Sequence, residues 1–258
     1  MPATTLAPLG APIWVDLMTS NPDVTRPFYA ELFGWEIDDP ATRGQDFGGY
    51  QNFLKDGAMI AGSMGNQSGM PDTWSVYLHV ADAEATAAAA TAAGATVYAP
   101  PMDVMDLGRM CVIGGPDGAA VGMWQPGTHV GTGTWGEAGT PSWYELHTAD
   151  YDGSVAFYKD IFGWPVDTMS DDPSFRYSTY GAGADVKAGI MDATSMLDGA
   201  PSNWKVYFQV DSADDAVAKA VELGGTQVSE PHDTPYGRLA IVTDPAGAEF
   251  CLMQPPAG

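Results

Sequence analysis

The sequence predicts an α+β protein built from four βαβββ units, which are arranged as two tandem modules. Three observations lead to this prediction. The chain matches itself at one fixed offset, each half alternates extended and helical segments in the same order, and the composition suits a packed core. Of the 258 residues, 45% are hydrophobic and 17% are charged, a balance that is typical of globular domains.

The two halves of the chain align at an offset of 129 residues. The aligned positions include Trp14 with Trp143, Phe28-Tyr29 with Phe157-Tyr158, Phe33-Gly34-Trp35 with Phe162-Gly163-Trp164, and Gly108-Arg109 with Gly237-Arg238. One register held over such a length indicates an internal duplication. We therefore expect one module at residues 10–127, a Gly- and Thr-rich linker at 128–138, and a second module at 139–256.

Apolar periodicity and turn residues give the order of elements in the first module. The predicted helices span residues 23–33 and 82–93, and the predicted strands lie near 13–19, 49–54, 58–63, 73–80, 96–98, 109–114 and 120–125. Asp23 and Asp82 are the expected N-caps, and Gly34 and Gly94 are the expected helix ends. Two such units side by side are expected to form a curved mixed sheet around a concave cavity, with the helices outside.

Charge and segment composition exclude several classes of protein. Ten Lys and Arg residues against 33 Asp and Glu residues give a net charge of −23, which repels nucleic acids and anionic membrane surfaces. No apolar run is long enough to span a membrane, and the first residues lack the pattern of a signal peptide. We expect a cytoplasmic protein, either a monomer or a homodimer, whose partner is a small molecule.

Several short motifs occur in the same order in both modules. In the first module they are Phe28-Tyr29, Phe33-Gly34-Trp35, Val80-x-Asp82, Gly108-Arg109 and Gly115-Pro116-Asp117-Gly118. Together, and over nearly the whole chain, this set resembles the vicinal oxygen chelate superfamily of glyoxalases, bleomycin-resistance proteins and extradiol dioxygenases. The match is best with its tandem two-module, actinobacterial glyoxalase-like members.

The resemblance implies a divalent-metal site on the first and last strands of the units. The positions that would supply the ligands hold Trp14, Trp143, Ser75, Lys205, Gly122 and Cys251. Indole, ammonium and glycine cannot coordinate such a cation. We therefore expect no cofactor and no metal at these positions. A non-standard metal site, with Glu145, His147 and a third ligand, is a lesser alternative.

Strand alternation predicts which side chains share the cavity with those positions. The candidate catalytic residues are Asp16 with His79 in the first module and Glu145 with His147 in the second. The candidate ligand-binding residues are Trp14, Trp143, Met18, Tyr77, Tyr207, Lys205, Gln209, Trp74, Trp204, Arg109 and Arg238. A structural alternative is that the two carboxylates only pair with Arg109, Arg238 or Lys205. His129 and His232 are expected to be solvated, and Cys111 and Cys251 to be buried and unreactive.

These residues favour a metal-independent enzyme that binds a largely apolar or aromatic molecule and transfers a proton in an isomerisation, cyclisation or lyase-type step. The alternative is a protein that sequesters a small molecule without chemistry, as bleomycin-resistance proteins do. A metal-dependent glyoxalase or dioxygenase is a lesser third possibility. The second module is the expected working site because His147 and Lys205 give it more titratable groups.

Overall fold

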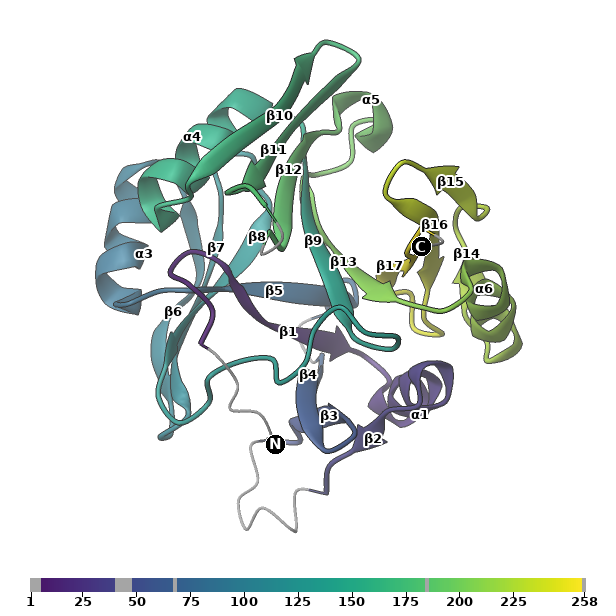
Figure 1. Ribbon diagram of the computed structural model, residues 1–258. Coiled ribbons are helices and arrows are strands. Elements are labelled where there is room, and N and C mark those ends of the chain that lie inside the picture. The colour runs from purple at the N-terminus through teal and green to yellow at the C-terminus, as the bar shows by residue number, and fades with distance from the viewer. Residues whose placement is uncertain (1–5, 40–47, 67–68, 184–185, 257–258) are drawn as a thin grey trace. The chain divides into compact units, whose positions relative to one another are not determined.

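The computed structural model describes residues 6–39, 48–66, 69–183 and 186–256. Its strands form two mixed sheets, which confirms the predicted α+β class (Figure 1). The elements of the first module are β1 (Pro12–Thr19), α1 (Pro22–Phe33), β2 (Glu36–Ile37), β3 (Gln51–Lys55), β4 (Ala58–Gly65), β5 (Thr73–His79), α3 (Ala83–Ala92), β6 (Thr96–Val104), β7 (Gly108–Gly114) and β8 (Ala120–Pro126).

Among the described residues, the second module repeats this order with two additions. Its elements are β9 (Pro141–Thr148), α4 (Tyr151–Phe162), β10 (Val166–Asp172), β11 (Phe175–Tyr180), β12 (Ala188–Asp192), α5 (Thr194–Leu197), β13 (Asn203–Gln209), α6 (Ala213–Glu222), β14 (Thr226–Gln227), β15 (His232–Thr234), β16 (Gly237–Thr243) and β17 (Glu249–Gln254). Four βαβββ units are therefore present, and the short α5 and β15 are the additions that the sequence did not predict.

The strand order follows the same rule in each βαβββ unit. The sheets run β2-β3-β4-β1-β5-β8-β7-β6 and β10-β11-β12-β9-β13-β17-β16-β14, with β15 paired to β16. In each unit the first strand pairs in parallel with the last strand, as β1 does with β4 and β9 with β12. The remaining pairs within a unit are antiparallel. The first strand of each βαβββ unit therefore lies beside the last strand of the same unit.

The helix termini agree with the sequence at α3 and differ at α1. The Asp82 side chain accepts from the backbone N–H of Ala85, as an N-cap should. Helix α1 begins at Pro22 with Asn21 as N-cap, so the assignment of Asp23 as N-cap was wrong. Asp23 lies in the first turn, where a carboxylate favours the positive end of the helix dipole. Gly34 ends α1 with a φ of 69°, as expected of a glycine cap.

Strand β6 is longer than the sequence predicted. The predicted strand ends at residue 98, whereas the observed strand continues through Pro100 and Pro101 to Val104, with register shifts at residues 97–99 and 99–102. Strand β6 lies at the edge of its sheet. A proline without an N–H is tolerated at a sheet edge and at bulges.

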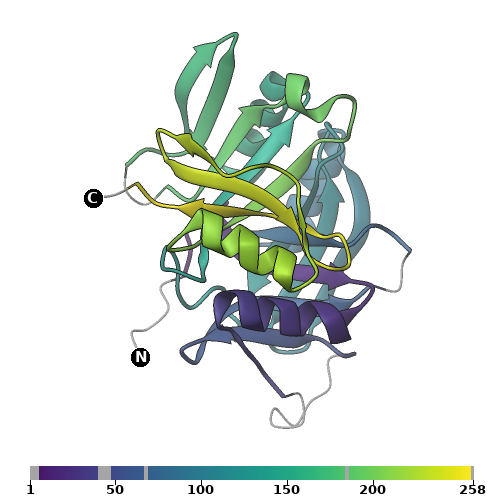
Figure 2. The same ribbon diagram turned by 90° about the vertical axis from the view of Figure 1, so that its right-hand side faces the viewer.

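The chain forms two compact units that do not coincide with the sequence modules. The first unit contains residues 6–14, 75–131 and 144–205, and the second contains 15–74, 132–143 and 206–256. Each unit therefore joins a βαβββ half of one module to a half of the other. Helices α3 and α4 lie side by side in the first unit (Figure 1). Helices α1 and α6 do so in the second unit (Figure 2).

Aromatic side chains hold the two halves of the second unit together. Phe208 of β13 lies within 5.1 Å of the ring centroids of both Phe33 and Trp74. Phe250 of β17 packs on Tyr29 at 5.3 Å, and the Tyr29 hydroxyl donates to Asp244 at 3.1 Å. Residues from both modules therefore share one hydrophobic core.

The two tryptophans that follow the Phe-Gly motif connect the modules in equivalent ways. The indole N–H of Trp35 donates to the carbonyl oxygen of Gly139, and that of Trp164 donates to the carbonyl oxygen of Gly10. Each acceptor lies just before the first strand of the other module. None of the helices in the described part of the chain is long and apolar enough to cross a bilayer.

Candidate functional site

Strand β9 carries the two groups that the sequence pairs in the second module, Glu145 and His147. Because side chains alternate across a strand, both lie on the same face. Glu145 is 8% exposed and His147 is 5% exposed. Nε2 of His147 lies 2.8 Å from Oε1 of Glu145. A carboxyl group and an imidazole thus form a buried hydrogen-bonded pair inside the first unit.

Tyr177 of β11 adds a third polar group, which the sequence analysis missed. Its hydroxyl donates to Oε2 of Glu145 at 2.5 Å, so both oxygens of the carboxyl group are hydrogen bonded. The tyrosine crosses β12 at Gly189, the residue paired with Glu145. A Cβ atom at position 189 would overlap the Tyr177 hydroxyl, so only glycine leaves room for this contact.

The hydrogen bonds suggest which atom of the pair can accept a proton. An ionised Glu145 accepts from the Tyr177 hydroxyl and from an N–H at Nε2 of His147. In that tautomer Nδ1 of His147 carries the lone pair, and no described residue is hydrogen bonded to it. A carboxylate that orients a histidine in this way is the arrangement that makes imidazole an effective general base.

A related arrangement that lacks the histidine lies on β1 of the first module. This part of the first module belongs to the second compact unit. Asp16 of β1 is 6% exposed and pairs with Gly62 of β4. The ring of Tyr50 crosses Gly62 just as Tyr177 crosses Gly189. The position equivalent to His147 holds Met18. Tyrosine and glycine are 12 residues apart in both modules, and this shared spacing is the signal by which Tyr177 could have been found.

His79, the predicted partner of Asp16, has a backbone contact in the first unit. Its Nδ1 lies 2.6 Å from the carbonyl oxygen of Ala7. A carbonyl oxygen can only accept, so Nδ1 carries the proton. Asp16 belongs to the second unit. The proposed pairing of His79 with Asp16 therefore stays a prediction.

His129 is packed against aromatic rings, so the expectation that it is solvated was wrong. The centroid of its ring lies 4.4 Å from that of Trp14 and 5.5 Å from that of Trp124, and both pairs of rings are T-shaped. The Trp124 indole N–H donates to the His129 carbonyl oxygen. Trp14 also packs with Ile13 and Tyr77 in this cluster. His232, by contrast, is exposed as expected.

We predict that His129 makes stability depend on pH. Burial lowers the pKa of His129 from 6.5 to about 4. Between these values the unfolded chain binds a proton that the folded chain does not. Stability is therefore lost as the pH falls through this window and is fully present above it, by an amount on the order of 2 kcal/mol. Denaturant unfolding at pH 7 and pH 4.5 measures the effect.

The matched variants for this experiment are His129→Phe and His232→Phe. Carboxylates also titrate in this range, so the useful quantity is the difference between each variant and the wild-type protein. His129→Phe should reduce the loss of stability on acidification, and His232→Phe should leave it unchanged. An equal loss in the wild-type protein and in His129→Phe would contradict the prediction.

The structure places two predicted ligand-binding tryptophans in aromatic cores. The indole N–H of Trp74 donates to the Tyr29 hydroxyl at 2.9 Å, and that of Trp204 donates to the Tyr158 hydroxyl at 3.0 Å. Both indoles are less than 8% exposed. These contacts favour a structural role. Along β13, Lys205 and Gln209 are half-buried and Tyr207 is buried. Trp143 on β9 is half-buried.

Both predicted arginines form ion pairs with exposed carboxylates. Arg109 binds Glu84 and Asp103, each at 2.8 Å. Arg238 binds Asp214 at 2.7 Å and Asp233 at 3.0 Å.

Burial raises the pKa of the Cys111 thiol and so disfavours its thiolate. Both cysteines are buried, as expected.

The residues present do not fit the divalent-metal site that the fold implies. No group of three or more His, Cys, Asp or Glu side chains in the described residues is arranged to hold a metal ion. At one mapped ligand position, Gly122, the ring of Tyr77 occupies the space where a side chain would begin. Glu145 and His147 therefore have no third ligand of these types among the described residues.

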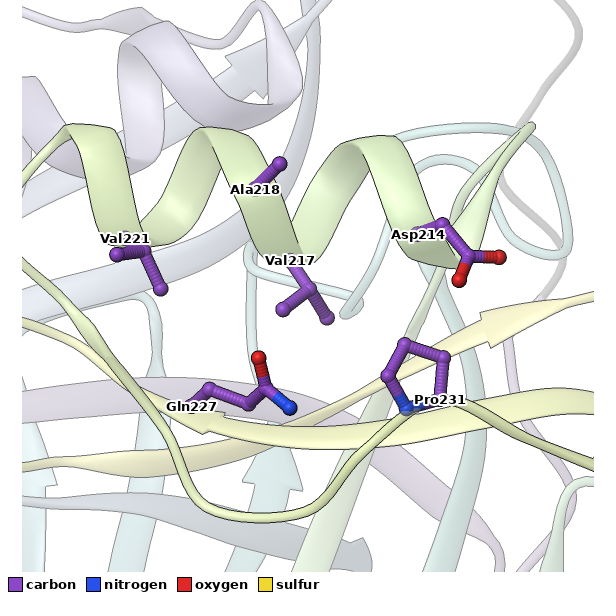
Figure 3. Close-up of a pocket in the computed structure, with 6 residues that line it drawn as sticks. All are labelled: Asp214, Val217, Ala218, Val221, Gln227 and Pro231. Atoms are coloured by element: carbon purple, nitrogen blue, oxygen red, sulfur yellow. The ribbon is translucent and has the colours of Figure 1, made fainter.

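A surface groove of about 440 Å³ lies beside α6 in the second unit. Figure 3 shows Val217, Ala218 and Val221 on the helix and Gln227 and Pro231 on the opposite segment. Its carboxylate, Asp214, is held by Arg238, which lowers the pKa of that carboxyl. The groove contains none of the predicted catalytic residues, and we assign no chemistry to it.

Comparison with known proteins identifies relatives along the whole chain. The glyoxalase-like domain family matches residues 13–121 and 143–253. The protein named "Putative glyoxylase CFP32" of Mycobacterium tuberculosis is 38% identical over 251 residues, which cover 95% of each chain. The anthracycline biosynthesis protein DauV of Streptomyces sp. is 35% identical over 273 residues, which cover 97% of this chain and 95% of DauV.

Solved structures share the fold at low sequence identity. The Mn(II)-bound glyoxalase from Novosphingobium aromaticivorans is 18% identical with a TM-score of 0.63, over 95% of this chain and 82% of that one. The 2,3-dioxygenase LapB from Pseudomonas sp. KL28 is 13% identical with a TM-score of 0.64, over 97% and 93% of the two chains. These similarities concern the fold alone.

Proposed function

The chain belongs to the glyoxalase-like family, and from this premise we propose that it is a metal-independent enzyme acting on a polycyclic aromatic molecule. The reaction class is proton transfer, within an isomerisation, cyclisation or lyase-type step. Glu145 and His147 are the proposed acid–base groups. The observation that carries the proposal is the buried hydrogen bond between them.

The proposed roles follow from the polarity of this hydrogen bond. Nδ1 of His147 accepts a proton from a C–H bond next to a substrate carbonyl, and the electron pair of that bond moves to the carbonyl oxygen. Glu145 orients the ring through Nε2 and stabilises the imidazolium that forms. Both side chains are buried on strand β9. The exclusion of water there strengthens the interaction between opposite charges.

Two further considerations support this class of substrate and this mode of catalysis. DauV is named for anthracycline biosynthesis, which favours a planar polyketide-like molecule over a small dicarbonyl. The absence of a three-ligand cluster among the described residues favours a mechanism that relies on side-chain proton transfer. The other candidate function, sequestration of the same kind of molecule, needs binding without turnover.

A paired measurement of binding and turnover with Glu145→Gln separates these functions. The test molecule is a four-ring anthracyclinone with a ring ketone, its binding is followed by tryptophan fluorescence, and its products by mass spectrometry. We expect Glu145→Gln to bind the compound within about threefold of wild type and to lose turnover by about 100-fold or more. The matched variant Asp16→Asn should retain turnover. Binding of the compound with no turnover by the wild-type protein would support sequestration instead.

A further inference from the structure

We infer that Tyr177, together with Gly189, is a positioning device that holds the Glu145 carboxylate and tunes how strongly His147 binds a proton. This role rests on the proposed function of the Glu145–His147 pair. Three observations carry it: a short hydrogen bond, a glycine that makes the bond possible, and the same glycine–tyrosine crossing in the other module.

The hydrogen bond is placed where it can affect the charge on Glu145. The Tyr177 hydroxyl donates to Oε2, while His147 is bonded to Oε1. A donor on one carboxylate oxygen stabilises the ionised form and reduces its basicity. Glu145 then holds the imidazolium of His147 less strongly than an unbonded carboxylate would. Tyr177 therefore keeps His147 able to release the proton that it has accepted.

The backbone of β12 provides the path for this contact. Gly189 is paired with Glu145 on one side and with Thr179 of β11 on the other. The phenol lies over Gly189, and an added methyl group there would overlap both its oxygen and its ring carbons. The ring of Phe175 is stacked on Tyr177 at 5.4 Å with an interplanar angle of 9°. The tyrosine is thus confined on two sides.

The titratable groups on the neighbouring strands bear on the proton affinity of His147. On β12 the residues beside Glu145 and His147 are Gly189 and Met191, neither of which titrates. On β11 the group that reaches the pair is Tyr177. Lys205 and Tyr207 of β13 are predicted from the sequence to share this face, and both are retained in every variant used below. Because Lys205 and Tyr207 are unchanged in these variants, a change in the proton affinity of His147 on altering Tyr177 or Gly189 is assigned to the Tyr177 hydroxyl.

The test is the apparent pKa of His147, measured by NMR titration of the imidazole in the full-length protein. Tyr177→Phe removes the donor, and Gly189→Ala displaces it while keeping the tyrosine. Each is expected to raise the apparent pKa of His147 by about one unit, since a hydrogen bond to a charged group is lost. The matched variants of the first module, Tyr50→Phe and Gly62→Ala, are expected to leave it unchanged.

The titration is independent of turnover, so it separates this inference from the proposed function. If Glu145→Gln and His147→Met retain turnover, the proposed function fails while the titration still tests the role of Tyr177. An unchanged His147 pKa in Tyr177→Phe would overturn the inference, even if the pair is catalytic. Tyr177→Phe preserves the ring and its stacking, so this outcome stays measurable if Gly189→Ala does not fold. In the active enzyme Tyr177→Phe should also lower kcat by about 10-fold, with a matching shift of the pH profile.

Discussion

Replacing His147 with methionine should lower kcat by about 100-fold to 10,000-fold, the range that general acid–base groups contribute. Methionine is the residue that the first module carries at the equivalent position, Met18, so its size and polarity are already compatible with this strand position. The thioether cannot accept a proton at neutral pH. Glu145 and Tyr177 remain in place, and substrate affinity should change by less than about threefold, because the loss is confined to proton transfer.

The internal duplication provides a control for this substitution, because the first module has an equivalent position. Met18→Gln alters the equivalent position in the first module and should leave kcat within about twofold of wild type. The measurement is steady-state turnover of the anthracyclinone together with its equilibrium binding. Equal losses from Met18→Gln and His147→Met would contradict the assignment of catalysis to the second module.

Phe208→Ala should destabilise the folded protein by about 3–5 kcal/mol, the usual cost of removing a large aromatic side chain from a core. Phe208 is fully buried, and its ring contacts Phe33, Trp35 and Trp74 of the first module. The substitution removes contacts between two sequence modules and leaves a cavity lined by rigid rings, which cannot collapse easily. Denaturant unfolding monitored by fluorescence gives the free energy of unfolding.

A surface residue in the same unit serves for comparison. Val228→Ala, at a side chain that is 52% exposed, should change the free energy of unfolding by less than about 0.5 kcal/mol. If Phe208→Ala behaved like Val228→Ala, the modules would not share a core at this position. A single cooperative transition that moves to lower denaturant in Phe208→Ala is the expected result.

Much of the architecture was predictable because it depends on local patterns that the duplication shows twice. The four βαβββ units follow from the order of apolar segments, helix caps and glycines, and they are confirmed. The pairing of Glu145 with His147 also follows from a local rule, since residues two apart on a strand share a face. Strand ends were less predictable, because the edge position that tolerates the prolines of β6 depends on the whole sheet.

The features that the sequence did not reveal depend on contacts between distant residues. Tyr177 reaches Glu145 only through the register of β9, β12 and β11, which no local pattern encodes. Each compact unit combines halves of both modules, and these halves meet where α3 contacts α4 and where α1 contacts α6. His129 lies in a segment whose composition resembles a flexible linker, yet its ring is covered by two indoles.

Deuterium incorporation into a bound substrate is the most direct test of proton abstraction by His147, because it detects abstraction whether or not a product is released. The anthracyclinone is incubated with protein in D2O, and exchange at the carbon beside its ketone is followed by mass spectrometry. We expect the wild-type protein to accelerate exchange by at least about 100-fold over buffer and His147→Met not to do so. Saturated binding by the wild-type protein with exchange no faster than in buffer would contradict this expectation.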